Sequence, residues 1–166
     1  KLIRDKDIKE FLDYEQGDAI EYLQFFFSEL DNEMIYNKFN IEFKYIYIDK
    51  DKVLFEKYDK NMIMNIYVPD KKNITLKYCI EEQYNSIDDN IWIDENNNSI
   101  DIKIRTLITR FPEYLIIQLS NNNGLLFGEY MRFRELYELF AIINYNRMMS
   151  HYYVSVRKDN GWAIYN

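Results

Sequence analysis

The last part of the chain, YELFAIINYNRMMSHYYVSVRKDNGWAIYN (residues 137–166), carries the pattern that decides the fold. From His151 to Arg157 the sequence alternates, which puts Tyr152, Val154 and Val156 on one face of a predicted strand and His151 on the other. Residues 158–161 (KDNG) are typical of a turn, and residues 162–165 predict a returning strand. The stretch therefore predicts an antiparallel β-hairpin.

This hairpin brings the only histidine of the chain, His151, toward Asn166. If Arg157 opposes Trp162, Asn166 becomes the diagonal neighbour of His151, about 7–8 Å away at the backbone. An amide oxygen there can accept a hydrogen bond from Nδ1 of the imidazole, which fixes the tautomer and leaves Nε2 free as a base. The alternative is a histidine hydrogen-bonded at the start of a strand, with Asn166 as an ordinary turn residue.

Length and composition indicate one folded domain, or a large piece of one, because 166 residues with 48% hydrophobic and 17% aromatic side chains can bury a core. A net charge of −7 argues against nucleic acid as a partner. One cysteine excludes an internal disulfide and fits a reducing compartment, and one Cys with one His cannot supply a four-ligand Cys/His zinc site. The residues given contain no signal-peptide pattern and no apolar run of about 18 residues, so we expect no membrane span.

The clearest helix is predicted after Gly17. Asp18 is a good N-cap, and Glu21 follows three residues later as in a capping box. Apolar residues then recur at helical spacing on one face, which predicts that this face lies in the core. They are Ala19, Tyr22, Leu23, Phe26, Phe27 and Leu30.

The middle of the chain predicts mostly β structure. Alternation indicates strands within residues 41–68 and 100–104, and residues 114–119 read as a short apolar strand at the centre of a sheet. One further helix is predicted over residues 74–84, with Cys79 on its buried face. Buried cysteines are usually inert, and an activated thiolate prefers a helix N-terminus or a cationic neighbour, which argues against Cys79 as a nucleophile.

Two of these stretches resemble the ubiquitin-specific proteases. Tyr137-x-Leu139-x-Ala141, then His151-Tyr152, then Trp162-x-x-Tyr165-Asn166 resemble the C-terminal signature of that family. The resemblance implies that His151 is a general base and that Asn166 orients it. Gln16-Gly17-Asp18-Ala19-Ile20-Glu21-Tyr22 resembles the family's second signature box. It implies that Gln16, Asp18 and Tyr152 hold the extended C-terminal tail of ubiquitin, since an acidic residue at a helix start can accept hydrogen bonds from a peptide.

The resemblance extends over nearly the whole chain and implies an α+β fold of the papain-like cysteine protease type. We expect one partial catalytic domain, with a helical part (residues 1–35) and a sheet-rich palm (residues 36–166) whose fingers are reduced and hold no zinc. The family's first box, which carries the nucleophilic cysteine, is absent. We therefore expect that cysteine upstream of Lys1 on a missing N-terminal lobe, so that this chain alone would be inactive. No cofactor is implied.

Two departures from the family pattern keep a second reading open. Asn144-Tyr145-Asn146 replaces the family's His-Ser-Gly, and Ser150 replaces the glycine before the histidine, where a Cβ takes room from the substrate. The first hypothesis is a thiol hydrolase that cleaves after the C-terminal glycine of ubiquitin or a ubiquitin-like protein. The alternatives are an inactive ubiquitin-binding pseudo-protease and a structural subunit of a larger complex. For all three we expect a cytoplasmic or nuclear location.

Overall fold

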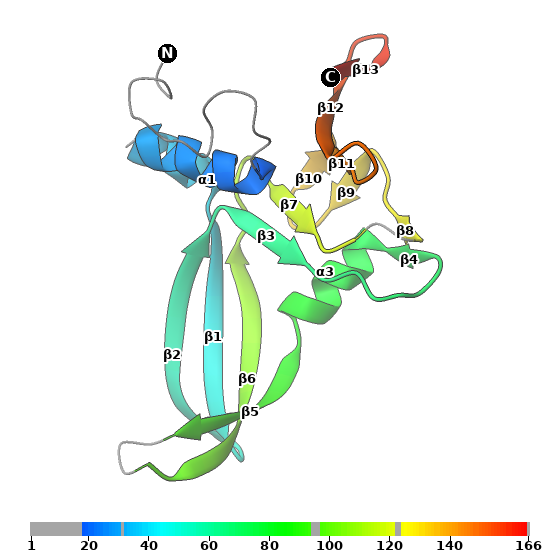
Figure 1. Cartoon of the computed structure of the whole chain (residues 1–166). Helices are drawn as coiled ribbons and strands as arrows, with labels where there is room; N and C mark the ends of the chain where they lie inside the picture. Colours follow the sequence, from blue (N-terminus) through cyan, green and yellow to red (C-terminus); the bar gives the residue numbers. More distant parts are fainter. Residues whose placement is uncertain (1–17, 31, 94–96, 122–123, 166) are drawn as a thin grey trace. The chain divides into compact units, whose positions relative to one another are not determined.

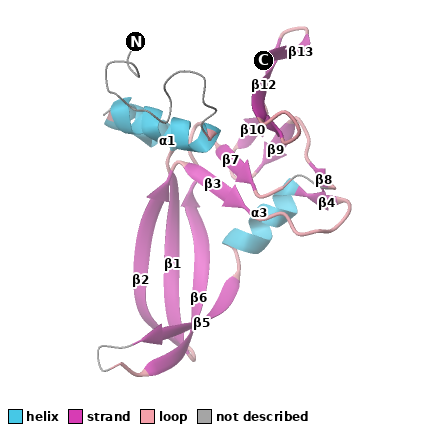
Figure 2. Ribbon diagram, viewed as in Figure 1, coloured by secondary structure: helices cyan, strands magenta, loops and turns pink. Residues whose placement is uncertain are grey.

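The computed structural model describes residues 18–30, 32–93, 97–121 and 124–165 (Figure 1). Strands make up most of the described chain, with three helices among them (Figure 2). Contacts divide the chain into two compact units, residues 1–32 with 138–166 and residues 33–137. The elements match the expected α+β class.

The larger unit is built on a four-stranded antiparallel sheet with the strand order β2-β1-β6-β5. The burial along the start of β1 agrees with the alternation of the sequence, because Ile41 and Phe43 are buried while Glu42 and Lys44 are only half-buried. The bounds are β1 (Ile41–Asp49), β2 (Lys52–Asn61), β5 (Ile87–Ile93) and β6 (Ser99–Arg110).

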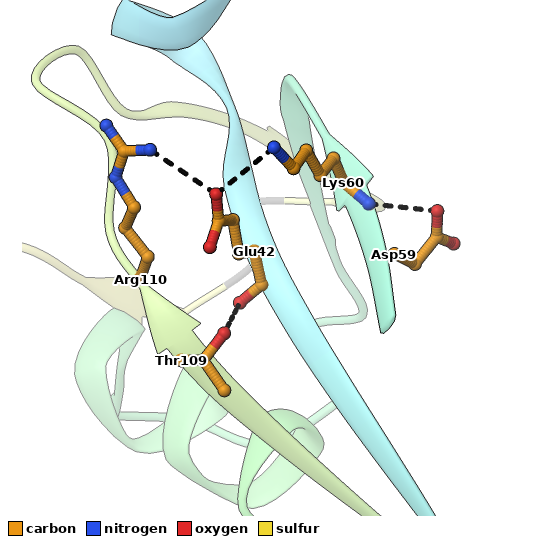
Figure 3. Close-up of polar contacts among 5 residues, drawn as sticks. All are labelled: Glu42, Asp59, Lys60, Thr109 and Arg110. Atoms are coloured by element: carbon orange, nitrogen blue, oxygen red, sulfur yellow. Dashed lines mark hydrogen bonds and ion pairs between the residues drawn. The ribbon is translucent and has the colours of Figure 1, made fainter. Parts of the chain in front are cut away.

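The polar face of this sheet is tied together by charged side chains (Figure 3). Glu42 of β1 lies 3.3 Å from Lys60 Nζ on β2 and 3.3 Å from Arg110 on β6, and both residues oppose it in the strand register. The backbone carbonyl of Glu42 also accepts a hydrogen bond from the Thr109 hydroxyl at 3.1 Å. These solvated pairs contribute little to stability, but they favour the observed strand register.

The opposite face is aromatic, and there the sheet curls until its two edge strands meet. Tyr47 stacks on Phe55 with ring centroids 4.2 Å apart, and Phe55 contacts Trp92 at 5.7 Å. Phe55 lies on β2 and Trp92 on β5, which are separated in the sheet by two strands. In a flat sheet three strand spacings are roughly 14 Å. The Phe55–Trp92 contact therefore closes a strongly curved end, and Figure 1 shows β5 crossing beneath β1 and β2.

The core of this unit lies beside the other end of the sheet and is completed by helix α3 (Leu76–Tyr84). The Thr75 hydroxyl caps this helix by accepting a hydrogen bond from the Tyr78 N–H. Two short parallel pairs contribute to the same core, β3 (Ile63–Ile66) with β7 (Ile116–Leu119) and β4 (Ile74–Thr75) with β8 (Leu125–Leu126). The buried cluster consists of Ile41, Phe43, Met64, Ile66, Val68, Ile74, Cys79, Ile80 and Leu125.

Some details of the larger unit differ from the sequence prediction. The apolar strand predicted over residues 114–119 begins at Ile116 and pairs only with β3 among the described residues, so its prediction as a central strand is wrong. Ile117 and Leu119 pack against the core cluster, so tertiary packing rather than a second flanking strand accounts for its apolar sequence. Several elements were not predicted, among them α2 (Glu33–Phe39), β8, β9 (Tyr130–Arg132) and β10 (Leu136–Glu138).

The smaller unit contains helix α1 (Ala19–Leu30) and a three-stranded antiparallel sheet of order β11-β12-β13. These strands are β11 (Ala141–Asn146), β12 (His151–Lys158) and β13 (Gly161–Tyr165). The predicted hairpin and its register are confirmed, because Arg157 opposes Trp162. On α1, Phe27 is buried, whereas Tyr22 and Phe26 remain 40% and 45% exposed and stack on one another instead of entering the core.

Within the part of the chain that the structure describes, no helix combines the length and apolar character needed to cross a membrane. The same described residues contain no group of three His, Cys, Asp or Glu side chains placed to hold a metal ion.

The curled end of the sheet makes a testable prediction. Replacing Trp92 with alanine removes the ring that contacts Phe55, so we expect Trp92→Ala to lower the free energy of unfolding by about 1–2 kcal/mol. Denaturant titration of the full-length protein measures this change. Ile91→Ala is the matched control, because Ile91 lies next to Trp92 in the sequence and its side chain is 63% exposed. We expect this variant to change the free energy of unfolding by less than about 0.5 kcal/mol. Equal effects of the two substitutions would contradict the role of Trp92.

Candidate functional site

Asp18 fixes the N-terminal end of α1. Its Oδ1 accepts hydrogen bonds from the backbone N–H groups of Ile20, at 2.7 Å, and Glu21, at 3.2 Å. The Asp18 carbonyl accepts the first helical hydrogen bond, from the Tyr22 N–H at 2.9 Å. This confirms Asp18 as the N-cap, and its negative charge lies favourably at the positive end of the helix dipole.

The second oxygen of the same carboxylate binds the hairpin. The Tyr152 hydroxyl donates a hydrogen bond to Asp18 Oδ2 at 3.1 Å, across 134 residues of sequence. Tyr152 is the second residue of β12, directly after His151. The structure therefore brings together two of the residues that the resemblance assigns to ubiquitin-tail binding.

Tyr145 supports Tyr152 from the neighbouring strand. The two residues oppose one another in the β11–β12 register, and their ring centroids lie 4.7 Å apart. Tyr145 is itself 52% exposed. Sequence reasoning named Tyr145 only as a departure from the family pattern, and it did not predict the β11–β12 pairing that places Tyr145 opposite Tyr152.

The environment of Tyr152 keeps its hydroxyl protonated. Burial raises the pKa of Tyr152, and the hydrogen bond and negative charge of Asp18 raise it further, while a backbone hydrogen bond with Ala19 lowers it. A protonated phenol can donate a hydrogen bond, which the contact with the carboxylate requires. Tyr152 therefore acts as a donor over the whole physiological pH range.

His151 begins β12 on the face opposite to Tyr152 and is half-buried. Its strand partner is Asn146, whose Oδ1 accepts hydrogen bonds from the N–H groups of Met148, at 3.0 Å, and Met149, at 3.3 Å. These contacts close the loop between β11 and β12 next to the histidine. The loop therefore sets where His151 begins its strand.

Ser150 completes this loop in a left-handed backbone conformation, with φ of 47°. That region favours glycine, because a Cβ approaches the following carbonyl oxygen. The pattern that the sequence resembles has glycine at this position, whereas Ser150 keeps a Cβ there. The departure noted from the sequence therefore has a structural counterpart.

Two predicted site residues, Gln16 and Asn166, lie outside the described residues. The last described residue of β13, Tyr165, opposes Val154. The roles of Gln16 as a tail-binding residue and of Asn166 as the partner of His151 stay predictions.

Cys79 lies in the middle of α3 and is only 1% exposed. Burial raises the pKa of its thiol, which opposes formation of the thiolate that a nucleophile needs. The structure agrees with the expectation that Cys79 is a core residue.

Comparisons with known proteins bear on the fold. No protein-family model matches the sequence, and neither does any curated protein. Solved structures do match. One is the SAGA Ubp8/Sgf11/Sus1/Sgf73 deubiquitinase (DUB) module bound to ubiquitin aldehyde, with a TM-score of 0.73 at 17% identity over 97% of this chain and 46% of that chain.

A second match is the SAGA DUB module bound to monoubiquitin, with a TM-score of 0.71 at 19% identity over 92% of this chain and 43% of the other. The chain thus spans less than half the length of the chains it matches. At such identity the likeness establishes the fold alone. The chain has the fold of part of a deubiquitinase module, which confirms the resemblance at that level.

The loop before His151 supplies a prediction about stability. Ser150→Gly removes the Cβ from the left-handed position, and we expect it to raise the free energy of unfolding by about 1 kcal/mol. The matched control is Gly161→Ala, because Gly161 has φ of 121° and its added Cβ meets no atom within 4 Å. Backbone strain alone should then make this variant less stable. A loss of stability in Ser150→Gly, measured by denaturant titration, would contradict the account.

Proposed function

We propose that this chain is part of a cysteine-type deubiquitinase, which cleaves the bond after the C-terminal glycine of ubiquitin. One observation carries the proposal, namely the hydrogen bond from Tyr152 to Asp18. It connects the start of the helix that resembles the family's second box to the strand that resembles its histidine box. The fold shared with the SAGA DUB module supports the same assignment.

In the proposed site, His151 acts as the general base and then as the general acid. A cysteine thiolate, supplied from upstream of this chain, attacks the carbonyl carbon of the terminal glycine of ubiquitin. His151 holds the thiol proton and delivers it to the leaving amine, and Asn166 orients the imidazole. Water then hydrolyses the thioester, with His151 taking the proton of the water. The papain-like arrangement of these groups is part of the proposal.

Asp18, Gln16 and Tyr152 hold the ubiquitin tail in this scheme. The carboxylate of Asp18 has room for an acceptor contact beyond the three hydrogen bonds it already accepts, because two oxygens offer about four lone-pair positions. Charge-assisted hydrogen bonds to a peptide N–H or to an arginine are among the stronger ones available. We expect the protein to act in the cytoplasm or nucleus, and a larger assembly remains part of the proposal.

The second candidate is a pseudo-protease that binds ubiquitin without cleaving it. Ser150 favours it, because its Cβ occupies the left-handed position where the family has glycine. The exposed ring of Tyr145, in place of the family's small serine, points the same way. Both features lie in β11 and in the loop that leads to His151 at the start of β12, so they affect the catalytic step more directly than they affect the fold. A structural subunit is the third reading.

A covalent probe separates these functions. The protein expressed from its full natural reading frame is mixed with ubiquitin that carries a thiol-reactive group at its C-terminus, and the products are weighed by intact mass spectrometry. We expect one covalent adduct, which His151→Ala abolishes. Cys79→Ser is the matched control and should leave the adduct intact, because Cys79 is buried in α3.

Other outcomes of this experiment distinguish the alternatives. Tight binding without an adduct, measured by calorimetry, indicates the pseudo-protease. An adduct that is lost in Cys79→Ser would place the nucleophile within this chain and overturn the proposal of an upstream cysteine. The absence of both adduct and binding would remove the ubiquitin function altogether and leave the fold.

A further inference from the structure

β2 and β5 are the two edge strands of the four-stranded sheet. All seven residues of β5 are exposed to solvent. β5 pairs with β6 along its whole length, from Ile87 opposite Arg105 to Ile93 opposite Ser99. No strand pairs with its other side among the described residues. An edge of this kind presents a row of backbone N–H and C=O groups to which another chain can add.

The outward direction of the backbone can be assigned at one residue. The Ile91 N–H donates a hydrogen bond to the Asn90 side chain at 2.8 Å. In an antiparallel ladder the N–H and C=O of one residue point to the same side, and alternate residues point to opposite sides. The backbone N–H and C=O of Ile91 therefore point away from β6, and those of Ile87, Asp89 and Ile93 point in the same direction.

One face of β5 is unusually apolar for a solvated strand. Ile87, Ile91 and Ile93 are 56%, 63% and 62% exposed, and their alternate spacing puts them on the same face. Apolar side chains that gather at an open edge are typical of a surface that binds another protein.

The edge is also held in place, which lowers the entropic cost of binding there. Trp92 points to the opposite face and contacts Phe55, while the ladder with β6 fixes the backbone. A partner strand would thus meet a preformed template, with the three isoleucines on one face.

Charge indicates what kind of strand fits. β5 carries Asp88 and Asp89 but no Lys or Arg. Asp89 is opposed on β6 by Lys103, whereas Asp88 is opposed by Ile104, so no cation stands directly across from Asp88. A residue of an added strand opposite Asp88 would therefore favour a positive charge. A second copy of this chain fits poorly, because it would bring another acidic strand and another net charge of −7.

We infer that β5 is a docking edge for an extended, basic segment of a partner protein, which adds to the sheet as a fifth strand. Apolar side chains of that segment pack on Ile87, Ile91 and Ile93, and a lysine or arginine on its other face pairs with Asp88. This inference concerns only the larger unit and is independent of the proposed ubiquitin function.

Two blocked peptides test the inference, acetyl-Lys-Val-Lys-Val-Lys-Val-Lys-amide and the same sequence with Glu in place of Lys, each labelled with fluorescein. Fluorescence anisotropy with the full-length protein gives their dissociation constants. We expect the lysine peptide to bind at least about tenfold more tightly, a difference of about 1.4 kcal/mol, because glutamate in place of lysine turns attraction to Asp88 and to the net negative protein into repulsion. Equal binding of the two peptides would overturn the inference.

Two variants test the site. Ile91→Pro removes an outward N–H, which donates to the Asn90 side chain in the unbound protein, but it removes no hydrogen bond to β6. It should therefore weaken binding of the lysine peptide at least about tenfold. Asp88→Lys changes one exposed charge and needs no change in backbone, and it should reverse the preference in favour of the glutamate peptide. Retained preference for lysine in Asp88→Lys contradicts the inference even if Ile91→Pro fails to fold.

Light scattering on the unmodified protein tests whether a second copy of this chain occupies the β5 edge instead. We expect a monomer at micromolar concentration. A dimer that Ile91→Pro converts to a monomer would show that β5 receives a second copy, and the inference of a basic partner segment would then be wrong.

Discussion

The smaller unit depends on one carboxylate. Asp18 caps α1 through Oδ1 and binds the hydroxyl of Tyr152 through Oδ2, so a single side chain fixes both the start of the helix and the strand that begins with His151. A neutral residue without a side-chain acceptor would lose both contacts at once. The same geometry that orders the fold thereby defines the proposed binding site, which is why the helix start and the histidine strand are best understood as parts of one feature.

In the larger unit, side-chain contacts on the two faces of the curved sheet take this role. Glu42 fixes the register on the polar face, and the aromatic contacts from Tyr47 through Phe55 to Trp92 draw the two edges together on the other. No disulfide is possible in a chain with one cysteine, so packed rings close this end of the sheet. All seven residues of β5 nevertheless stay exposed, and that exposure is the basis of the inferred docking edge.

The sequence predicted what depends on local rules. The cap at Asp18, the alternation along β1 and the hairpin with Arg157 opposite Trp162 follow from spacing and turn chemistry, and the structure has all three. The sequence did not predict that the strand within residues 114–119 pairs with only one other strand among the described residues, because burial by packing and burial between strands leave the same apolar sequence. The Phe55–Trp92 contact was equally hidden, since it depends on how far a sheet curls. The contact of Tyr152 with Asp18 was implied only through a shared functional assignment.

The claim that Asp18 and Tyr152 belong to one ubiquitin-binding site is tested most directly by a double-mutant cycle. Ubiquitin affinity of the full-length protein is measured for Asp18→Asn, Tyr152→Phe and the double variant. Asn retains the helix cap and Phe retains the ring, so each change removes mainly the charge or the hydroxyl. The account predicts that both single variants weaken binding and that their effects are coupled by about 0.5–3 kcal/mol. Strictly additive effects, or single variants that bind as well as the unmodified protein, would contradict it.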